Sequence, residues 1–277
     1  MDFSELSHQR EIRESLNKIF SEKCSPEKLK EFDNEFKHDE NLYDFLATNG
    51  YLGLGINEKL NGSGEDLYDL GILFECLGFY AVPLSLTGCL VDVAQTLQKF
   101  SKNDNHQSII SSITKGEIYT SAILEPLNHD PENPTTTAVF DGDKVIINGS
   151  KYLSEISSLA KGILISASSN KGVILVLVKT DNVKLTQLTS TANSPLFKVE
   201  LNNVSIEQSD IVHQEGRGLE TLRYLLQINM VMRSYIALGV TNKMTSLIAS
   251  YTSEREQFGR VIGTFQAVSH RAADCFI

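Results

Sequence analysis

The spacing of apolar residues changes twice along the chain, and this change limits the folds that it can adopt. Residues 1–117 repeat apolar side chains at helical spacing, as in LSHQREIRESLNKIF. Residues 118 to about 205 alternate at every second position instead, as in GILISASS and GVILVLVK. From residue 216 the helical spacing returns. Because helices repeat every 3.6 residues and strands every two, we expect helices, then strands, then helices.

Turn residues mark the limits of individual elements. Ser25-Pro26 predicts a helix start, Asn49-Gly50 a helix stop, and Asp141-Gly142 the turn of a hairpin. Short strands of this kind favour a small antiparallel barrel or sandwich. We therefore predict an α+β protein of several domains. These are an N-terminal helical domain (1–117), a middle β-domain (118–215) and an incomplete C-terminal helical bundle (216–277).

One very long helix is expected over residues 216–257. Between Arg223 and Lys243 its only charged residue is Arg233. A helix that is apolar nearly all round is buried on several sides. The helix that follows is still open at Ile277, so this sequence does not supply enough cover. We expect that the cover comes from a second polypeptide, or that the chain is a truncated product.

Composition excludes several classes of function. The net charge is −10 and there is no basic run, which argues against nucleic acid or an anionic membrane as partner. The start lacks an apolar signal core, and the longest apolar run, 173–178, is too short to span a membrane. Four irregularly spaced cysteines and scattered histidines predict reduced thiols and no metal site. A cytoplasmic location is expected.

The segment SEREQFGRVIGTFQAV carries the most specific group of side chains. Arg255 is expected on the last turn of the long helix, with Gly259 as its C-cap. A guanidinium there can pair in bidentate fashion with a pyrophosphate, and Phe258 offers an aromatic face to an adenine. Gln257 and Gln266 can donate nearby hydrogen bonds. The alternative is an ion pair between Arg255 and a neighbouring glutamate on a solvated helix end.

These motifs resemble those of the acyl-CoA dehydrogenase family of flavoproteins, over essentially the whole chain. LYDFLATNGYLGLGINEKLNGSGEDLYDLGILFECLG is similar to the family's N-terminal signature. VELNNVSIEQSDIVHQEGRGLETL resembles the segment that leaves its β-domain, and REQFGRVIGTFQAVSHRAAD resembles a highly specific family motif. The resemblance implies an α-domain, a β-domain and a second α-domain that together form a four-helix bundle.

The resemblance also implies a reaction, a cofactor and partners. Family members oxidise the Cα–Cβ bond of an acyl-CoA or other acyl thioester and pass the hydride to FAD. The flavin lies at a subunit interface, so a homo- or hetero-oligomer with an acyl-CoA dehydrogenase-like subunit is expected. The flavin contacts carried over from the REQFG motif are Arg255, Gln257, Phe258 and Gln266.

The β-domain matches the family less well. Glu125-Pro126 matches a family TEP motif, and Ser154 can partly replace the hydroxyl residue of a W-[IV]-[ST] motif, so Glu125 and Ser154 are further candidate flavin contacts. Leu124 stands where the family has Thr, Leu153 replaces the Trp, and Glu155 occupies the hydroxyl position. Losing an aromatic ring removes much of the flavin's apolar wall, and a nearby carboxylate disfavours a reduced, negative flavin.

The catalytic base cannot be assigned from the sequence. The family base usually lies beyond this chain's last residue, or in an ER pair on the long helix, where this chain has Asn229 and Met230. Neither side chain can abstract a proton. Arg233 and Tyr251 are the candidate substrate contacts, although a lone Arg in an apolar helix is commonly a paired structural residue.

Three interpretations stay open: a dehydrogenase subunit that acts only with a partner, a non-catalytic structural or binding homologue, and an inactive remnant. We expect the isolated chain to hold little FAD and to turn over no acyl-CoA. The acyl group cannot be read from the sequence.

Overall fold

A computed structural model describes residues 4–35, 38–64, 66–191 and 194–276. The chain divides into two compact units. The first consists of Met1–Cys24, Gly71–Val82 and Ser234–Ile277, and the second of Ser25–Leu70 and Pro83–Arg233. Among the described residues, no helix combines the length and apolarity that a membrane crossing requires. Ile277, where the last helix was expected to be still open, lies outside the described residues.

The N-terminal part is helical, as predicted. Its elements are α1 (Ser7–Lys23), α2 (Pro26–Glu35), α3 (Glu40–Thr48), the short 3₁₀ helices η1 (Tyr51–Gly53) and η2 (Glu58–Leu60), α4 (Leu67–Phe79), the π-helix η3 (Thr87–Gln95), α5 (Thr96–Phe100) and α6 (Asp104–Ile113). The predicted start at Ser25-Pro26 is confirmed, since the Ser25 hydroxyl accepts from the Lys28 amide at 3.3 Å. The predicted stop at Asn49-Gly50 is confirmed too, with Gly50 at φ +80°.

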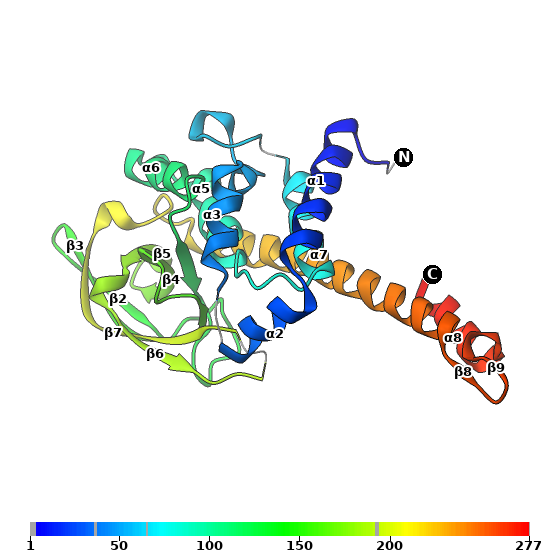
Figure 1. The fold of residues 1–277 in the computed structure, drawn as a ribbon. Helices are drawn as coiled ribbons and strands as arrows, with labels where there is room; N and C mark the ends of the chain where they lie inside the picture. Colours follow the sequence, from blue (N-terminus) through cyan, green and yellow to red (C-terminus); the bar gives the residue numbers. More distant parts are fainter. Residues whose placement is uncertain (1–3, 36–37, 65, 192–193, 277) are drawn as a thin grey trace. The chain divides into compact units, whose positions relative to one another are not determined.

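The middle part is one curled seven-stranded sheet (Figure 1). Its strands are β1 (Tyr119–Ala122), β2 (Thr137–Asp141), β3 (Lys144–Glu155), β4 (Gly162–Ser169), β5 (Gly172–Lys179), β6 (Lys184–Leu188) and β7 (Leu196–Glu207). They lie in the order β1-β4-β2-β3-β7-β6, with β5 paired to β4. The predicted hairpin turn joins β2 to β3, and its Gly142 has φ +58°. Alternate apolar side chains of these strands form one buried core.

The prediction of an antiparallel sheet is wrong for two strand pairs. β1 runs parallel to β4, with Tyr119 opposite Gly162, and β2 makes a short parallel contact with β4. The β2–β3 hairpin separates β1 from β4 in the chain, so β4 can return in the direction of β1. Apolar alternation identifies a strand but does not give its direction, and the sheet is therefore mixed.

The long helix α7 spans Gly218–Glu254. In the second unit its residues Leu222, Leu225 and Met232 are buried. Further along, in the first unit, Met244 and Leu247 are about half exposed, so the expected burial on several sides does not hold for that part of the described chain. Within the first unit α7 approaches α4 closely, because a Cβ on Gly239 would lie 1.9 Å from the Glu75 carbonyl oxygen.

The predicted end of the long helix is wrong by three residues. α7 ends at Glu254, and a two-strand hairpin follows, β8 (Glu256–Gln257) and β9 (Arg260–Val261). Phe258 and Gly259 form its turn with φ of 56° and 77°. Two consecutive positive φ values are typical of a type I′ hairpin turn, so Gly259 is not a helix C-cap. The helix α8 (Gln266–Phe276) comes after it.

Candidate functional site

The π-helix η3 carries one acidic residue, Asp92, in an otherwise apolar run. Asp92 is only 4% exposed, and η3 packs against β1 within the second unit. π-helical geometry is rare and is frequently found at functional sites. A buried carboxylate in such a segment needs hydrogen-bond partners, because an unsatisfied buried charge is strongly unfavourable.

Two neutral side chains from other elements supply these partners. Ser121 of β1 donates its hydroxyl to Asp92 Oδ2 at 2.5 Å. Asn229 of α7 donates its amide to Asp92 Oδ1 at 2.7 Å. Burial raises the pKa of Asp92 to about 7, and the two hydrogen bonds only partly oppose that rise. The carboxyl group can therefore gain and lose a proton near neutral pH.

The hydrogen-bond chain continues from Asn229 to an ion pair. The Asn229 side-chain oxygen accepts from Arg233 Nε at 2.9 Å, and Arg233 Nη2 donates to Glu155 Oε1 at 3.1 Å. The Arg233 side chain is 54% exposed. Arg233 thus has the paired structural position that the sequence left open, with part of its guanidinium still facing outward. Its role as a substrate contact stays a proposal.

The end of β3 next to this network has an unusual backbone. Leu153 and Ile156 have φ of 58° and 43°, and the β3–β7 register shifts between Lys151 and Ser154. Positive φ is strained for such residues and is concentrated at functional sites. Ser154 is buried, donates to the Ser121 carbonyl oxygen at 2.7 Å and accepts from the Ser157 hydroxyl at 2.7 Å. Its hydroxyl therefore has no spare proton for a flavin.

Glu125 lies in the second unit, and its carboxylate is fully engaged. It accepts from Lys151 Nζ at 2.7 Å, from the Thr135 amide and hydroxyl at 2.6 Å each, from the Thr136 amide at 2.9 Å and from the Asn128 side-chain amide at 3.1 Å. Burial opposes the charged form, but these donors outweigh it and hold the pKa of Glu125 well below its usual range. The predicted flavin contact therefore has a structural side chain.

The side chains of the C-terminal motif, unlike that of Glu125, are exposed. Arg255, Gln257 and Gln266 are exposed, and Phe258 is 92% exposed. Among the described residues, no hydrogen bond or ion pair engages the side chain of Arg255, so the alternative ion pair with a neighbouring glutamate does not form there. Tyr251, the second candidate substrate contact, is 60% exposed in the first unit.

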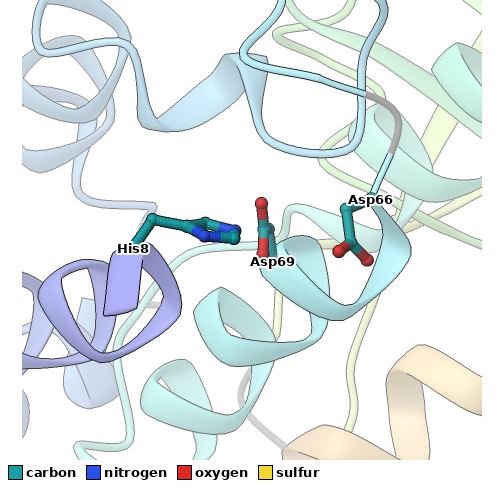
Figure 2. Close-up of side chains that lie close together, drawn as sticks. All are labelled: His8, Asp66 and Asp69. Carbon is teal, nitrogen blue, oxygen red and sulfur yellow. The ribbon is translucent and has the colours of Figure 1, made fainter. Parts of the chain in front are cut away.

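Figure 2 shows three side chains of metal-ligand type, His8, Asp66 and Asp69. Asp66 Oδ1 accepts from the Tyr68 amide at 2.8 Å at the start of α4, and Asp69 is buried in the first turn of that helix. His8 belongs to the first unit and the two aspartates to the second. No metal site is assigned to them.

Comparison with protein families identifies the chain. Residues 7–117 match the model of the acyl-CoA dehydrogenase N-terminal domain, and residues 216–277 match that of the C-terminal domain. The chain belongs to the acyl-CoA dehydrogenase family. It is 26% identical to acyl-CoA dehydrogenase FadE27 of Mycobacterium tuberculosis, and the match covers 100% of this chain and 73% of FadE27.

Solved structures share the fold over at least 99% of the chain. The ChsE4-ChsE5 complex from Mycobacterium tuberculosis gives a TM-score of 0.91 at 25% identity, over 99% of this chain and 74% of the other. PigA with FAD and proline gives 0.90 at 22% identity, over 100% and 76%. The predicted family, its helix–sheet–helix fold class and, at the level of the family, FAD as the cofactor are confirmed.

The two halves of the expected flavin contact differ in how well they fit FAD. The C-terminal motif fits, because Arg255 and Gln257 present donors that nothing else in the described chain uses, and Phe258 presents an open aromatic face. The end of β3, Leu153 to Glu155, which we call the β3 wall, does not fit well, because Ser154 and Glu155 are already bonded within the chain.

Sequence reasoning about this member of the family missed Asp92. One signal was present, namely a single acidic residue inside GCLVDVAQ. An Asp in an otherwise buried apolar helix is rarely left unpaired, so it predicts polar partners from neighbouring elements. The partners themselves, at positions 121 and 229, could not be found without the fold.

Proposed function

We propose that this chain is a subunit of an FAD-dependent acyl-CoA dehydrogenase and that it acts only together with a second, similar subunit. The reaction is the α,β-dehydrogenation of an acyl-CoA or other acyl thioester. The observation that carries the proposal is the exposed C-terminal motif: the Arg255 side chain has no hydrogen bond or ion pair within the described chain, and Phe258 contacts Phe265 edge to face but is still 92% exposed. We also propose that the chain has three domains, namely an N-terminal helical domain (1–117), a β-domain (118–215) and a C-terminal helical domain (216–277).

The motif residues have the chemistry that FAD requires. The guanidinium of Arg255 binds the pyrophosphate, Phe258 packs on the adenine, and Gln257 and Gln266 donate hydrogen bonds. When bound, FAD accepts the hydride from Cβ. Arg233 and Tyr251 are the proposed substrate contacts. Arg233 is held by Asn229 and Glu155, which leaves its second terminal nitrogen for a polar group of the substrate.

The β3 wall supports the need for a partner. Leu153, at the position of the family's tryptophan, is 43% exposed and offers no aromatic ring, and Ser154 has no free donor. The similar ChsE4-ChsE5 structure is a complex of two named subunits, which favours a heteromeric assembly here as well. The proposed cytoplasmic location is supported by the buried thiols of Cys24, Cys76 and Cys89, which form no disulfide within the described chain.

Co-purification tests this function. The chain is expressed alone and together with the product of any adjacent homologous gene, and flavin absorbance and dye-coupled oxidation of an acyl-CoA panel are measured. We expect little flavin and no turnover from the chain alone, and both from the complex. Near-stoichiometric flavin with turnover in the isolated chain would contradict partner dependence. A complex that oxidises no acyl-CoA would contradict the activity.

The Glu155–Arg233 ion pair favours a second candidate, a non-catalytic structural subunit. It places a carboxylate at a flavin-contacting position and uses the arginine that would serve the substrate. The variant Arg255→Ala separates the two functions. If the complex keeps its flavin content and its turnover after this substitution, the chain serves its partner only as a scaffold.

A further inference from the structure

We propose that Asp92 is the carboxylate base of this site and takes the α proton from the acyl thioester. The inference rests on the proposed function above and supplies the catalytic residue that the sequence left unassigned. Asn229 and Ser121 are its positioning residues, since each donates a hydrogen bond to one of its oxygens.

The position of Asp92 next to Asn229 supports this role. Asn229 occupies the place on α7 where a carboxylate was sought in the sequence, and its amide nitrogen lies 2.7 Å from Asp92 Oδ1. A carboxylate is therefore present within one hydrogen bond of that place, although it comes from η3. Each oxygen of Asp92 accepts one hydrogen bond from a side chain, which leaves a second lone pair on each oxygen for a proton.

The charged groups around Asp92 support the same role. The direct partners of Asp92 are neutral, and the charged groups that act on it, Glu155 of β3 and Arg233 of α7, have opposite effects. Burial dominates and raises the pKa of Asp92 to about 7. A general base works best when its pKa lies near the operating pH. Glu125, which is bonded to Lys151, is held in its charged form and is a poor proton acceptor.

The step balances without any further reactant. The Cα–H bond of the thioester breaks and its proton moves to an oxygen of Asp92. The electron pair stays on the thioester as an enolate, with the negative charge on the thioester oxygen. Asp92 then releases the proton to solvent. Reversal of the step returns a solvent-derived proton to Cα, so the reaction can be followed without net oxidation of the acyl group.

Deuterium exchange at Cα is the test. The complex of the full chain with its partner subunit is incubated anaerobically with octanoyl-CoA in deuterated buffer, and deuterium at Cα is measured by mass spectrometry. General-base catalysis contributes roughly 10²–10⁴-fold, so Asp92→Asn should slow exchange by about 100-fold or more. The matched control is Asp39→Asn, another buried aspartate of the same unit, which caps α3 and pairs with Lys28. It should leave exchange unchanged.

Each other outcome decides against the inference. Equal exchange in Asp92→Asn and in the unmodified complex overturns the role of Asp92 and leaves the proposed function standing. Loss of octanoyl-CoA binding by Asp92→Asn, measured by calorimetry, overturns it too, because the role is then structural. If the unmodified complex shows no exchange, the inference fails, and flavin reduction in the same sample shows whether the proposed function fails with it.

A second measurement decides the question if Asp92→Asn does not fold. The exchange rate of the unmodified complex should rise with pH around a midpoint near 7. Ser121→Ala removes a donor that favours the charged form of Asp92, so the midpoint should move to higher pH. An unchanged midpoint in Ser121→Ala overturns the inference.

Discussion

Two buried carboxylates of the second unit have opposite surroundings. Glu125 lies against a buried lysine and four further donors from Asn128, Thr135 and Thr136, and its pKa is held well below its usual range. Asp92 has only two neutral donors, and burial raises its pKa to about 7. Both carboxyl groups accept hydrogen bonds, so the presence of hydrogen-bond partners alone does not distinguish them. The presence or absence of a bonded cation decides whether such a group is structural or can exchange a proton.

The comparison also predicts opposite dependences of stability on pH. Glu125 has a lowered pKa, so its contribution is present above its unfolded pKa near 4.5 and is lost as the pH falls below that value. Asp92 has a raised pKa, so the folded chain binds its proton more tightly. Its contribution is favourable at low pH and is lost as the pH rises through about 7.

The largest expected effect comes from removing the lysine. Lys151→Met leaves the Glu125 carboxylate buried without a cation. Breaking a buried ion pair on one side should lower the free energy of unfolding by about 3–5 kcal/mol, which urea denaturation measures. The double variant Lys151→Met/Glu125→Gln should recover much of that loss. A single variant as stable as the unmodified chain would show that the pair is not a structural element.

The next effect in size is the pH dependence that Asp92 causes. A pKa raised from 3.8 to about 7 corresponds to about 4 kcal/mol that the folded chain loses as Asp92 ionises. Stability of the unmodified chain should therefore fall as the pH rises from about 4 to about 7, and Asp92→Asn should flatten that part of the profile. Denaturation at several pH values measures it. A slope that persists unchanged in Asp92→Asn would assign it to other groups.

A smaller effect is expected for the hydroxyl that Ser121 donates. Ser121→Ala removes one hydrogen bond to a charged Asp92, which should destabilise the chain by about 1.5–3 kcal/mol when the carboxylate is ionised and by less when it is protonated. Denaturation on both sides of neutral pH checks this difference. If the loss is the same on both sides, the hydroxyl does not respond to the charge of Asp92.

The smallest effect on stability is expected at the C-terminal motif. Arg255→Ala should change the free energy of unfolding by less than about 0.5 kcal/mol, because the side chain is exposed and unbonded in the described chain. In the complex the same change should lower flavin content. Arg271→Ala, on the exposed helix α8, is the matched control and should keep the flavin. Equal flavin loss in both variants would mean that charge alone matters.

Local signals allowed much of the fold to be predicted. Periodicity identified the helices and strands, because burial on one face repeats at the period of the element. Strand direction was not predictable, which is why the parallel pairing of β1 with β4 was missed. The end of the long helix was misplaced because a glycine with positive φ serves both helix C-caps and type I′ turns, and Gly259 lies in the turn.

The candidate site was less predictable than the fold. Arg255 and Phe258 form part of a continuous motif, so sequence alone singled them out. Asp92, Ser121 and Asn229 lie on a π-helix, a strand and an α-helix that are far apart in the sequence. Only tertiary packing brings these three side chains within hydrogen-bond distance, and the spacing of residues in the sequence does not predict such contacts.

The protonation of Asp92 is the most direct test of the difference between the two carboxylates. Infrared spectroscopy distinguishes the C=O stretch of a protonated carboxyl group from that of a carboxylate, and the full chain is titrated across neutral pH. We predict a carboxyl band that is lost with a midpoint near pH 7, is absent from Asp92→Asn and persists in Glu125→Gln. A spectrum without such a band near neutral pH, or one in which the band disappears with Glu125→Gln and persists in Asp92→Asn, would contradict the account.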